Sequence, residues 1–540
     1  MVEINSGNNP GENEPVSSGQ TDYKWKVLAT VLFGIFMVIL DTTVVNVAFQ
    51  AIREEFGGDI NISQWVISIY VLVLGIITPL AGFLADRFGA KKVYLSGLGL
   101  FAIGSLLCGI SPSLGLLIAA RAIQGMGGGI AMPLGIVLLL QAFPVREHGR
   151  ALGLFGIAAL VAPAVGPILG GWLVDQNLWR VIFFVNPPIG LVGVLLGVRF
   201  LRENQDKTKP GLDIAGIITE VIGFGSVLYA ASIASEQGWT SPTTLMFLAV
   251  GIIGLVSFGI VELKFSKSPL MDLFLFKNPV FLFASLIGYV SVVALFGAEF
   301  LMPVYLQSLR GLSAFQTGLV LLPMAVAGGI FVTLSGRLYD RVGPRPLLAC
   351  GFALLVLNTW QLSRIQADTS LGWIIFLLVL RGFAFGLTVQ TTIVTSLSVV
   401  PSRDLARGSS LTNSSRLVVQ SIGVALLATV LASALSPDVK SFQDQAQTTQ
   451  NSASSAGLCR NLDGSTGAEA PTAGKLASLN PAGGSGVMDL ACQENITGFE
   501  RAYTLTFYAS LAALFFAFLL PGWPGRWSGR QGSAPAAPMH

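Results

Sequence analysis

Apolar runs recur along almost the whole chain, each of about twenty residues and therefore long enough to cross roughly 30 Å of hydrocarbon as a helix. The runs stay apolar throughout, which favours helices over a membrane β-barrel with its short alternating strands. Only 11% of the 540 residues are charged, and the mean hydropathy is +0.69. The pattern predicts an all-α polytopic membrane protein.

Polar breaks between the runs predict about fourteen transmembrane helices. The predicted spans are 27–49, 64–84, 93–112, 114–142, 149–174, 181–201, 214–234, 244–263, 280–303, 314–335, 347–365, 371–397, 409–435 and 501–521. Residues 1–24 are polar, lack a cleavable signal peptide and are expected to be a disordered tail, and residues 523–540 form a second tail.

The distribution of Lys and Arg predicts the orientation. An even number of spans places both termini on one side, and basic residues mark the cytoplasmic connections. Most fall on alternate connections shared with the termini, whereas the short connections on the other face hold only Arg53, Arg180, Arg310 and Arg364. We therefore expect cytoplasmic termini in a cell membrane.

One expected extracytoplasmic connection, 437–500, is long and rich in Ala, Ser, Gly, Thr and Gln, a composition that cannot bury a core. Cys459 and Cys492 lie within it, where an oxidising compartment would permit a disulfide. The segment is either a flexible insertion without a transport role or a lid over the outer vestibule.

Motifs in the first part of the chain recur in the second part. The sequence GFLADRFGAK from Gly82 recurs as GRLYDRVGPR from Gly336, an offset of about 254 residues. Arg121 matches Arg381, and Asp41 matches Glu299, at similar offsets. These repeats predict two six-helix halves, 25–202 and 279–522, with two inserted helices in 203–278.

Duplicated halves with a site between them are typical of secondary transporters. No nucleotide-binding loop of the form GxxxxGK[ST] is present, so we expect an ion or substrate gradient to supply the energy. Two histidines and four cysteines without metal-ligand spacing argue against a metal or cofactor. The small net charge of +3 does not indicate a nucleic-acid partner, and no catalytic cluster is visible.

The repeated motif lies in a tight turn where glycines let two helices approach closely. Its acidic and basic residues either form a latch that separates as the halves move or only hold the loop inside. The gating residues are Gly82, Asp86, Arg87, Gly89 and Lys91, and in the second copy Gly336, Asp340, Arg341 and Gly343.

Charged side chains within predicted spans are costly unless partnered or hydrated, and four of them are candidates for a role in coupling: Asp41, Glu220, Glu299 and Arg121. A buried carboxylate holds its proton more tightly, so the acids are candidates for proton coupling at the seam between the halves. Asp41 or Glu299 could instead neutralise an arginine. Arg121 either anchors backbone carbonyls or takes part in proton movement.

The fifth span has a small-residue face and a kink that the second half does not repeat, formed by Gly166, Pro167, Gly170 and Gly171. Polar and aromatic residues elsewhere are weaker candidates for a substrate cavity, since packing explains most of them equally well. They are Asn46, Trp65, Tyr70, Gln124, Tyr305, Gln307, Gln390 and Asn413.

At these residues the sequence resembles the major facilitator superfamily, and within it the fourteen-span drug/proton antiporter family. The resemblance covers roughly 25–435 and the last span, and its carriers are LDTTVVNVA from Leu40, the motif from Gly82, RAIQG from Arg121, GPILGG from Gly166 and WRVIFFVN from Trp179. Glu220 and the 437–500 segment depart from the family pattern.

The resemblance implies the major facilitator fold and an exchange of protons for small amphipathic drugs. Glu220, as a departure from the family pattern, suggests either a cationic substrate or a second coupled proton. It assigns Asp41 to protonation, Arg121 to coupling, Gly166 and Pro167 to the antiporter signature, and Asp86 with Arg87 to the cytoplasmic gate. A monomer is expected, with accessory efflux proteins left open. Alternatives are an exporter dedicated to one metabolite, peptide, siderophore or lipid, and a transport-inactive receptor or scaffold.

Overall fold

The computed structural model describes residues 18–57, 60–144, 147–203, 211, 213–266, 269–401, 404–436, 439, 459 and 484–520. Over these residues the protein is helical and contains no strand. Fourteen of the described helices have 19 residues or more, as the apolar runs predict. Twelve are long and apolar enough to span a membrane, and the described apolar part of the ninth, Pro279–Leu295, is a shorter segment.

The helices fall into three groups along the chain. The N-terminal half comprises α1 (Ser18–Phe56), α2 (Ile60–Phe88), α3 (Ala90–Ile110), α4 (Leu114–Ala142), α5 (His148–Asp175) and α6 (Trp179–Phe200). The inserted pair comprises α7 (Ile214–Gln237) and α8 (Pro242–Ile260), which continues as the π-helical turn η2 (Val261–Phe265). The C-terminal half comprises α9 (Pro279–Val304), α10 (Ala314–Val342), α11 (Pro344–Leu362), α12 (Leu371–Leu397), α13 (Leu405–Ser433) and α16 (Gly484–Leu519).

Two helices begin earlier than the sequence predicts. Helix α1 starts at Ser18, inside the segment 1–24 expected to be disordered. Helix α16 starts at Gly484, inside the segment 437–500 expected to be a loop, because Ala491, Cys492 and Phe499 are buried against the C-terminal half. Most of 437–500 and all of 523–540 lie outside the described residues.

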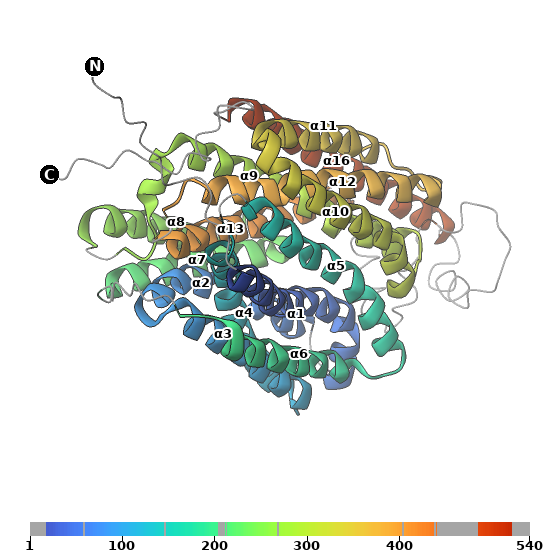
Figure 1. Cartoon of the computed structure of the whole chain (residues 1–540). Coiled ribbons are helices and arrows are strands. Elements are labelled where there is room, and N and C mark those ends of the chain that lie inside the picture. The colour runs from blue at the N-terminus through green and yellow to red at the C-terminus, as the bar shows by residue number, and fades with distance from the viewer. Residues whose placement is uncertain are drawn as a thin grey trace, which may run out of the picture.

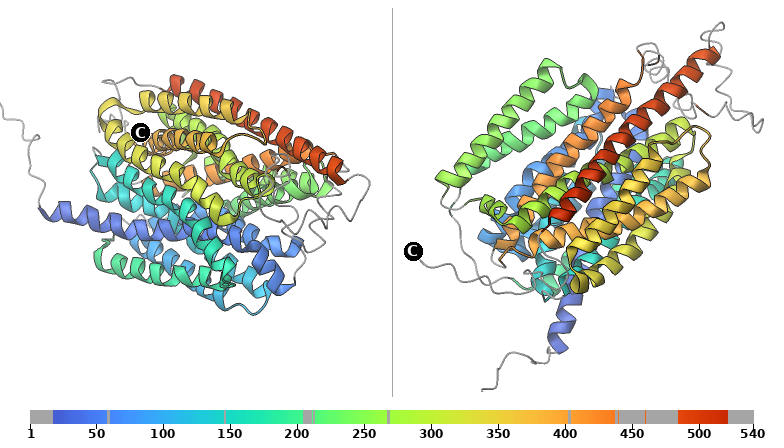
Figure 2. Two further views of the ribbon diagram at one scale, coloured as in Figure 1. Left: turned by 90° about the vertical axis from the view of Figure 1, so that its right-hand side faces the viewer. Right: turned by 90° about the horizontal axis from the view of Figure 1, so that it is seen from above.

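The halves meet through equivalent helices. Figure 1 shows α1–α6 on one side of the molecule and α10–α13 with α16 on the other. The main contacts between the halves are those of α5 with α10 and of α2 with α13. The second and fifth helices of each half therefore contact the other half. We call the end with the α2–α3 and α10–α11 turns the proximal end, and the opposite end the distal end. Figure 2 shows the inserted pair to one side of the two halves.

Motif glycines permit the contact at the proximal end. A β-carbon on Gly82 of α2 would lie 2.7 Å from the carbonyl oxygen of Ala406 on α13. A β-carbon on Gly336 of α10 would lie 2.2 Å from the carbonyl oxygen of Gly149 on α5. No β-carbon fits at such distances, so the two motif copies bring two helix pairs into backbone contact.

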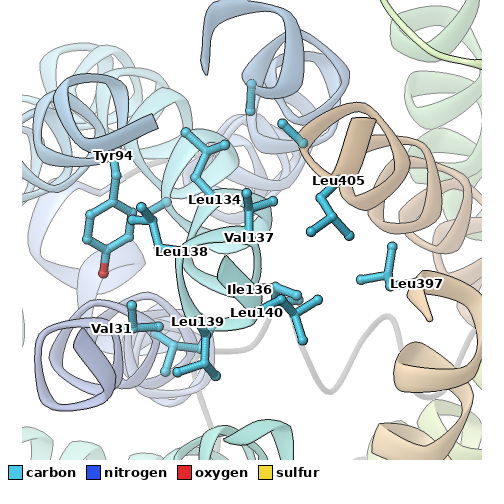
Figure 3. Packing of buried hydrophobic residues seen from close by; sticks show 14 of the residues in the cluster. Val31, Tyr94, Leu134, Ile136, Val137, Leu138, Leu139, Leu140, Leu397 and Leu405 are labelled. Atoms are coloured by element: carbon cyan, nitrogen blue, oxygen red, sulfur yellow. The ribbon is translucent and has the colours of Figure 1, made fainter. Parts of the chain in front are cut away.

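Apolar packing joins the halves beside this contact. Figure 3 shows Leu405 of α13 and Leu397 of α12 directed toward Val137 and Leu140 of α4. All four side chains are at most 5% exposed and belong to one core cluster. Burying such residues favours a closed proximal end.

The inserted pair packs on the groove between the halves. Gly223 of α7 and Gly254 of α8 face each other so closely that a β-carbon on either would lie within 2.8 Å of the other helix's backbone. On its other side α7 contacts both α2 and α13. The insertion therefore touches the two helices of one inter-half contact.

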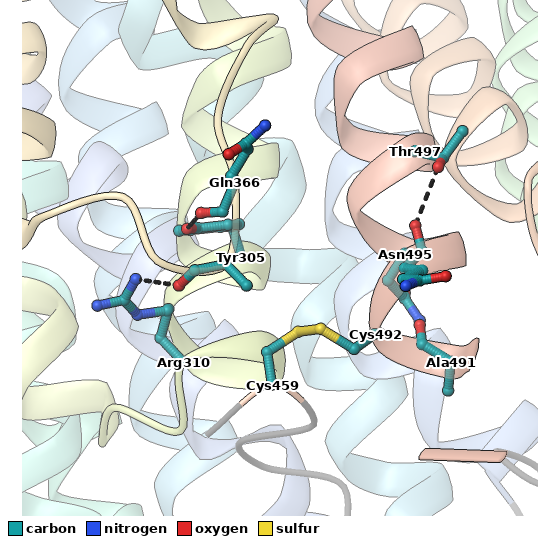
Figure 4. The surroundings of a disulfide bond; sticks show 10 residues. Tyr305, Arg310, Gln366, Cys459, Ala491, Cys492, Asn495 and Thr497 are labelled. Carbon is teal, nitrogen blue, oxygen red and sulfur yellow. Dashed lines mark hydrogen bonds between the residues drawn. A yellow bond between two sulfur atoms is a disulfide. The ribbon is translucent and has the colours of Figure 1, made fainter. Parts of the chain in front are cut away.

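A disulfide joins Cys459 to Cys492, with 5.3 Å between their α-carbons, and Figure 4 shows it beside Tyr305 and Arg310. The backbone N–H of Cys459 donates to the carbonyl of Leu309, and both cysteines are buried in a core cluster of the C-terminal half. The bond ties Cys459 of the long connection to helix α16 at the distal end.

The substitution Gly82→Leu is expected to push α2 away from α13 and to destabilise the fold by about 1–3 kcal/mol, because a side chain has no room against the Ala406 carbonyl. Thermal unfolding in detergent measures the change. Gly99→Leu on α3 is the control, because nothing lies within 4 Å of its β-carbon position, and it should alter stability by less than about 0.5 kcal/mol. Equal effects of the two variants would contradict the interpretation.

Candidate functional site

A carboxylate held by three donors lies at the centre of the N-terminal half. Asp41 is 1% exposed in the middle of α1. Arg121 Nη1 donates to its Oδ2 at 2.5 Å. Gln124 Nε2 and Asn186 Nδ2 donate to its Oδ1 at 2.8 and 3.0 Å. Both carboxylate oxygens are therefore occupied, by side chains from α4 and α6.

Arg121, like Asp41, forms several hydrogen bonds in addition to the ion pair. Its Nε donates to the carbonyl of Val66 on α2 at 2.9 Å, and its Nη1 also reaches Gln124 Oε1 at 2.7 Å. The guanidinium lies 4.1 Å from the centre of the Tyr70 ring, a cation–π distance. Arg121 and Gln124 are three residues apart on α4, so one helix face supplies both donors to Asp41.

The cluster explains how two charges persist in an apolar bundle. An isolated buried ion costs several kcal/mol, and only a close partner with further hydrogen bonds offsets that cost. The sequence predicts carboxylates at the seam between the halves, but the structure places Asp41 inside the N-terminal half. In this conformation Asp41 neutralises Arg121, which is one of the two alternatives drawn from the sequence.

The C-terminal half holds its matching arginine differently. Arg381 of α12 donates to the backbone carbonyls of Ala294 and Leu295 on α9, at 2.6 and 2.9 Å, and to Asn358 Oδ1 at 3.1 Å. Glu299 lies in α9, but its side chain is outside the described residues. The two halves thus share a buried arginine but surround it with different groups.

An ion pair joins the halves at the proximal end. Arg407 Nε of α13 donates to Asp86 Oδ2 of α2 at 2.7 Å, and both side chains are less than one fifth exposed. The pair lies one turn from the contact of Gly82 with Ala406. We call the contact formed by Asp86, Arg407, Gly82 and Ala406 the inter-half latch.

Other motif residues shape the turns. Gly89 and Gly343 have positive φ angles of 100° and 80°, which favour glycine. Lys91 Nζ donates to the carbonyl of Leu201 at 2.6 Å and so ties the start of α3 to the end of α6. The side chain of Asp340 lies outside the described residues.

The small-residue face of α5 packs on the segment of α1 that carries Asp41. A β-carbon on Gly166 would lie 2.1 Å from Thr43 Oγ1, and one on Gly170 would lie 3.2 Å from Val44. Gly318 of α10 approaches α5 from the other half, and its β-carbon position lies 3.4 Å from Pro167. Helix α5 therefore connects the surroundings of Asp41 to the C-terminal half.

The expected cavity residues divide into packed and accessible groups. Tyr70 and Gln124 belong to the Asp41 cluster. Tyr305 is fully buried, and its hydroxyl donates to the Gln366 carbonyl. None of these three is therefore an accessible lining residue.

Three more of the expected cavity residues contact neighbouring side chains or backbone. Trp65 stacks on Tyr229 of the inserted pair, and the Asn413 amide donates to the Ser409 carbonyl. Gln390 is 4% exposed and lies beside Gly156. Asn46 is exposed and Gln307 is half-buried.

Sequence reasoning missed three polar residues. Arg407 holds the latch and Asn186 completes the Asp41 cluster. Arg416 lies within α13, next to Tyr289 of α9, and forms no salt bridge with any residue that the structure describes. Arg121 stands out in the sequence because it is an arginine inside a predicted span. Arg416 lies inside the predicted span 409–435 and could have been identified in the same way.

At the distal end, beyond the first span, Glu55 binds the start of α6. Arg180 Nη2 donates to Glu55 Oε1 at 2.8 Å, and Trp179 donates to Oε2. Burial opposes ionisation of Glu55, but these hydrogen bonds outweigh it and lower its pKa below the usual value.

The fold and the site define a class of protein: a multi-pass membrane transporter made of two related halves, with buried charges inside them and a latch between them. The chain belongs to the Major Facilitator Superfamily, whose profile matches residues 31–424. Among the described residues no group of acidic, histidine or cysteine side chains could hold a metal ion.

Relatives of the chain include transporters linked to drug resistance. The chain is 35% identical to the uncharacterized MFS-type transporter YhcA of Bacillus subtilis over 75% of this chain and 76% of that protein. It is 31% identical to the lincomycin resistance protein LmrB of Listeria monocytogenes, over 80% and 91%. It is 33% identical to the multidrug resistance protein Stp of Mycobacterium tuberculosis, over 78% of each.

A solved structure shares the fold. The proton:xylose symporter XylE aligns with a TM-score of 0.58 at 14% identity, over 93% of this chain and 97% of that chain. At that identity the likeness concerns the fold alone.

The substitution Asp41→Asn is expected to destabilise the protein by about 3–5 kcal/mol, because it leaves the buried charge of Arg121 without its anionic partner. The double variant Asp41→Asn with Arg121→Gln should lose less than the sum of the two single variants. Thermal unfolding in detergent measures all four proteins, with Asn46→Ala on the exposed face of α1 as control. Additive losses would show that the pair is not energetically coupled.

The substitution Arg407→Gln is expected to weaken the closed proximal end by about 1.5–3 kcal/mol, the contribution of a hydrogen bond between charged groups. Spin labels on Lys92→Cys of α3 and the exposed native Cys350 of α11 report the distance between the halves. Arg199→Gln, an exposed arginine at the proximal end of α6, is the control. Unchanged distances in Arg407→Gln would remove the pair from the latch.

Proposed function

We propose that the protein is a proton-coupled exporter of small amphipathic compounds that works by alternating access. The observation that carries the proposal is the Asp41–Arg121 pair, in which Asp41 belongs to α1, the helix packed against the small-residue face of α5. Helix α5 in turn packs on α10 of the other half. A change of charge at Asp41 therefore has a short packed route to the interface between the halves.

The proposed coupling is a competition between a proton and Arg121 for Asp41. Protonation removes the negative charge of Asp41, so its hydrogen bond from Arg121 loses the charge assistance that makes it strong. Arg121 retains the Val66 carbonyl, Gln124 and the Tyr70 ring as alternative partners. The segment of α1 around Asp41 is then free to shift against Gly166 and Gly170.

The proposed motion opens the proximal end. The structure has the Asp86–Arg407 ion pair formed and Gly82 in contact with α13, so this end is closed. The distribution of basic residues supports a cytoplasmic proximal end in the cell membrane. Separating the latch would expose the site to the cytoplasm for loading of substrate.

The substrate class is supported by the names of relatives that confer lincomycin or multidrug resistance. The sequence favours cationic compounds, but Arg416 offers a positive charge within α13 without a salt bridge to a described residue. Acidic and zwitterionic compounds therefore belong in the test set beside cationic dyes. Efflux of a single compound would favour a dedicated exporter, and the absence of any transport would favour a receptor or scaffold.

The test compares two transport modes in proteoliposomes. Asp41→Asn is expected to reduce efflux driven by a pH gradient by about 100-fold or more, because a side chain that cannot titrate cannot couple the proton. Exchange of labelled for unlabelled substrate without a gradient should persist, since it needs no net proton movement. A pH-sensitive dye inside the vesicles should report proton entry on addition of substrate to the wild-type protein.

A structural role of Asp41 predicts a different result, because a misfolded protein loses both modes equally. Phe33→Leu, at a residue of α1 that is 40% exposed and lies outside the proposed site, serves as the control on the same helix. If the wild-type protein moves substrate but no protons under any gradient, the proton-coupled mechanism is wrong, although the assignment as a transporter stands.

A further inference from the structure

The proximal end of the inserted pair carries three acidic side chains outside the site described above. Asp213 caps the start of α7, Glu220 lies two turns along it, and Glu262 lies in η2 at the end of α8. A β-carbon on Gly216 would lie 2.8 Å from Asp213 Oδ2 and 3.0 Å from Glu262 Oε1. Carboxylates from two helices thus meet one turn before Glu220.

Glu220 has no partner for its charge among the residues that the structure describes. It is 0% exposed, and neither of its oxygens has a hydrogen-bond partner among the described residues. Glu262 is 4% exposed, and its Oε1 accepts from the backbone N–H of Leu270 at 3.2 Å whereas its Oε2 is unpaired within the described chain. A fully buried carboxylate without a cation or donors is far more stable as a neutral acid.

A basic group of the latch acts on this cluster. Arg407 interacts electrostatically with Glu262 and donates to Asp86 at 2.7 Å. Asp404 also acts on Asp86, while Lys264 in η2 is exposed. Helix α7 packs against α2 and α13, the two helices that Asp86 and Arg407 join.

We propose that Glu220 and Glu262 form a proton-binding site in the inserted pair that sets the strength of the Asp86–Arg407 latch. When both acids are neutral, Asp86 is the main anionic partner of Arg407, and the latch stays closed. Loss of a proton to water at the proximal end places a negative charge near Arg407. That charge competes with Asp86 and loosens the contact between the halves.

The inference deepens the proposed function and rests on it for the gating role of the latch. The binding of the proton stands apart from transport, because it can be observed in a protein that moves no substrate. It also gives the insertion a role: α7 and α8 bring an acid-sensitive charge to the one inter-half contact that they touch.

Infrared difference spectroscopy of the full-length protein in lipid tests the proton site directly. Raising the pH should remove a carboxylic-acid C=O band from the wild-type spectrum, and Glu220→Gln or Glu262→Gln should abolish that change. Asp175→Asn, at an exposed carboxylate of the distal end, should leave the band intact. A band that titrates identically in all three variants would overturn the site.

The spin-label pair on Lys92→Cys and Cys350 tests the link to the latch. In the otherwise wild-type protein the population with separated halves should rise on the order of tenfold as the pH is raised, a size typical of coupled sites. In Glu262→Gln it should stay low at every pH, because no charge develops near Arg407. An unchanged pH response in Glu262→Gln would overturn the link even if the infrared band is present. Loss of proton-driven efflux with both signals intact would instead contradict the proposed function.

Discussion

The cost of holding charge inside an apolar bundle governs this structure. Asp41 and Arg121 are both at most 1% exposed, and each is tolerated only because the other lies 2.5 Å away and amide or carbonyl groups fill the remaining positions. Four helices contribute to that arrangement, α1, α2, α4 and α6. The requirement therefore fixes how the N-terminal half packs as well as where its charge lies.

Close backbone approach is the second constraint, and it links the halves to that charge. Gly166 and Gly170 bring α5 against the turn of α1 that carries Asp41, and Gly82 and Gly336 bring each half against the other at the proximal end. Glycine lets these backbones pack tightly, and the motion that we propose for the halves would separate the contact of Gly82 with α13.

The inserted helices also hold a buried acidic side chain, but its surroundings differ from those of Asp41. Glu220 is as deeply buried as Asp41 but has no cation partner among the described residues, whereas Arg121 lies 2.5 Å from Asp41. Two buried acids in one protein therefore lie in different electrostatic surroundings. The difference comes from their neighbours and not from their depth.

The sequence alone determined the helices, the duplication and the intramembrane charges, because these depend on local composition and periodicity. Spans 114–142 and 371–397 coincide with α4 and α12, and Asp41, Arg121 and Glu220 stand out in apolar surroundings. Only the tertiary structure decided which charges meet. Asp86 pairs with Arg407 across 321 residues, and Asp41 lies inside one half and not between the two. Such partners depend on how helices rotate and pack, which no local pattern encodes.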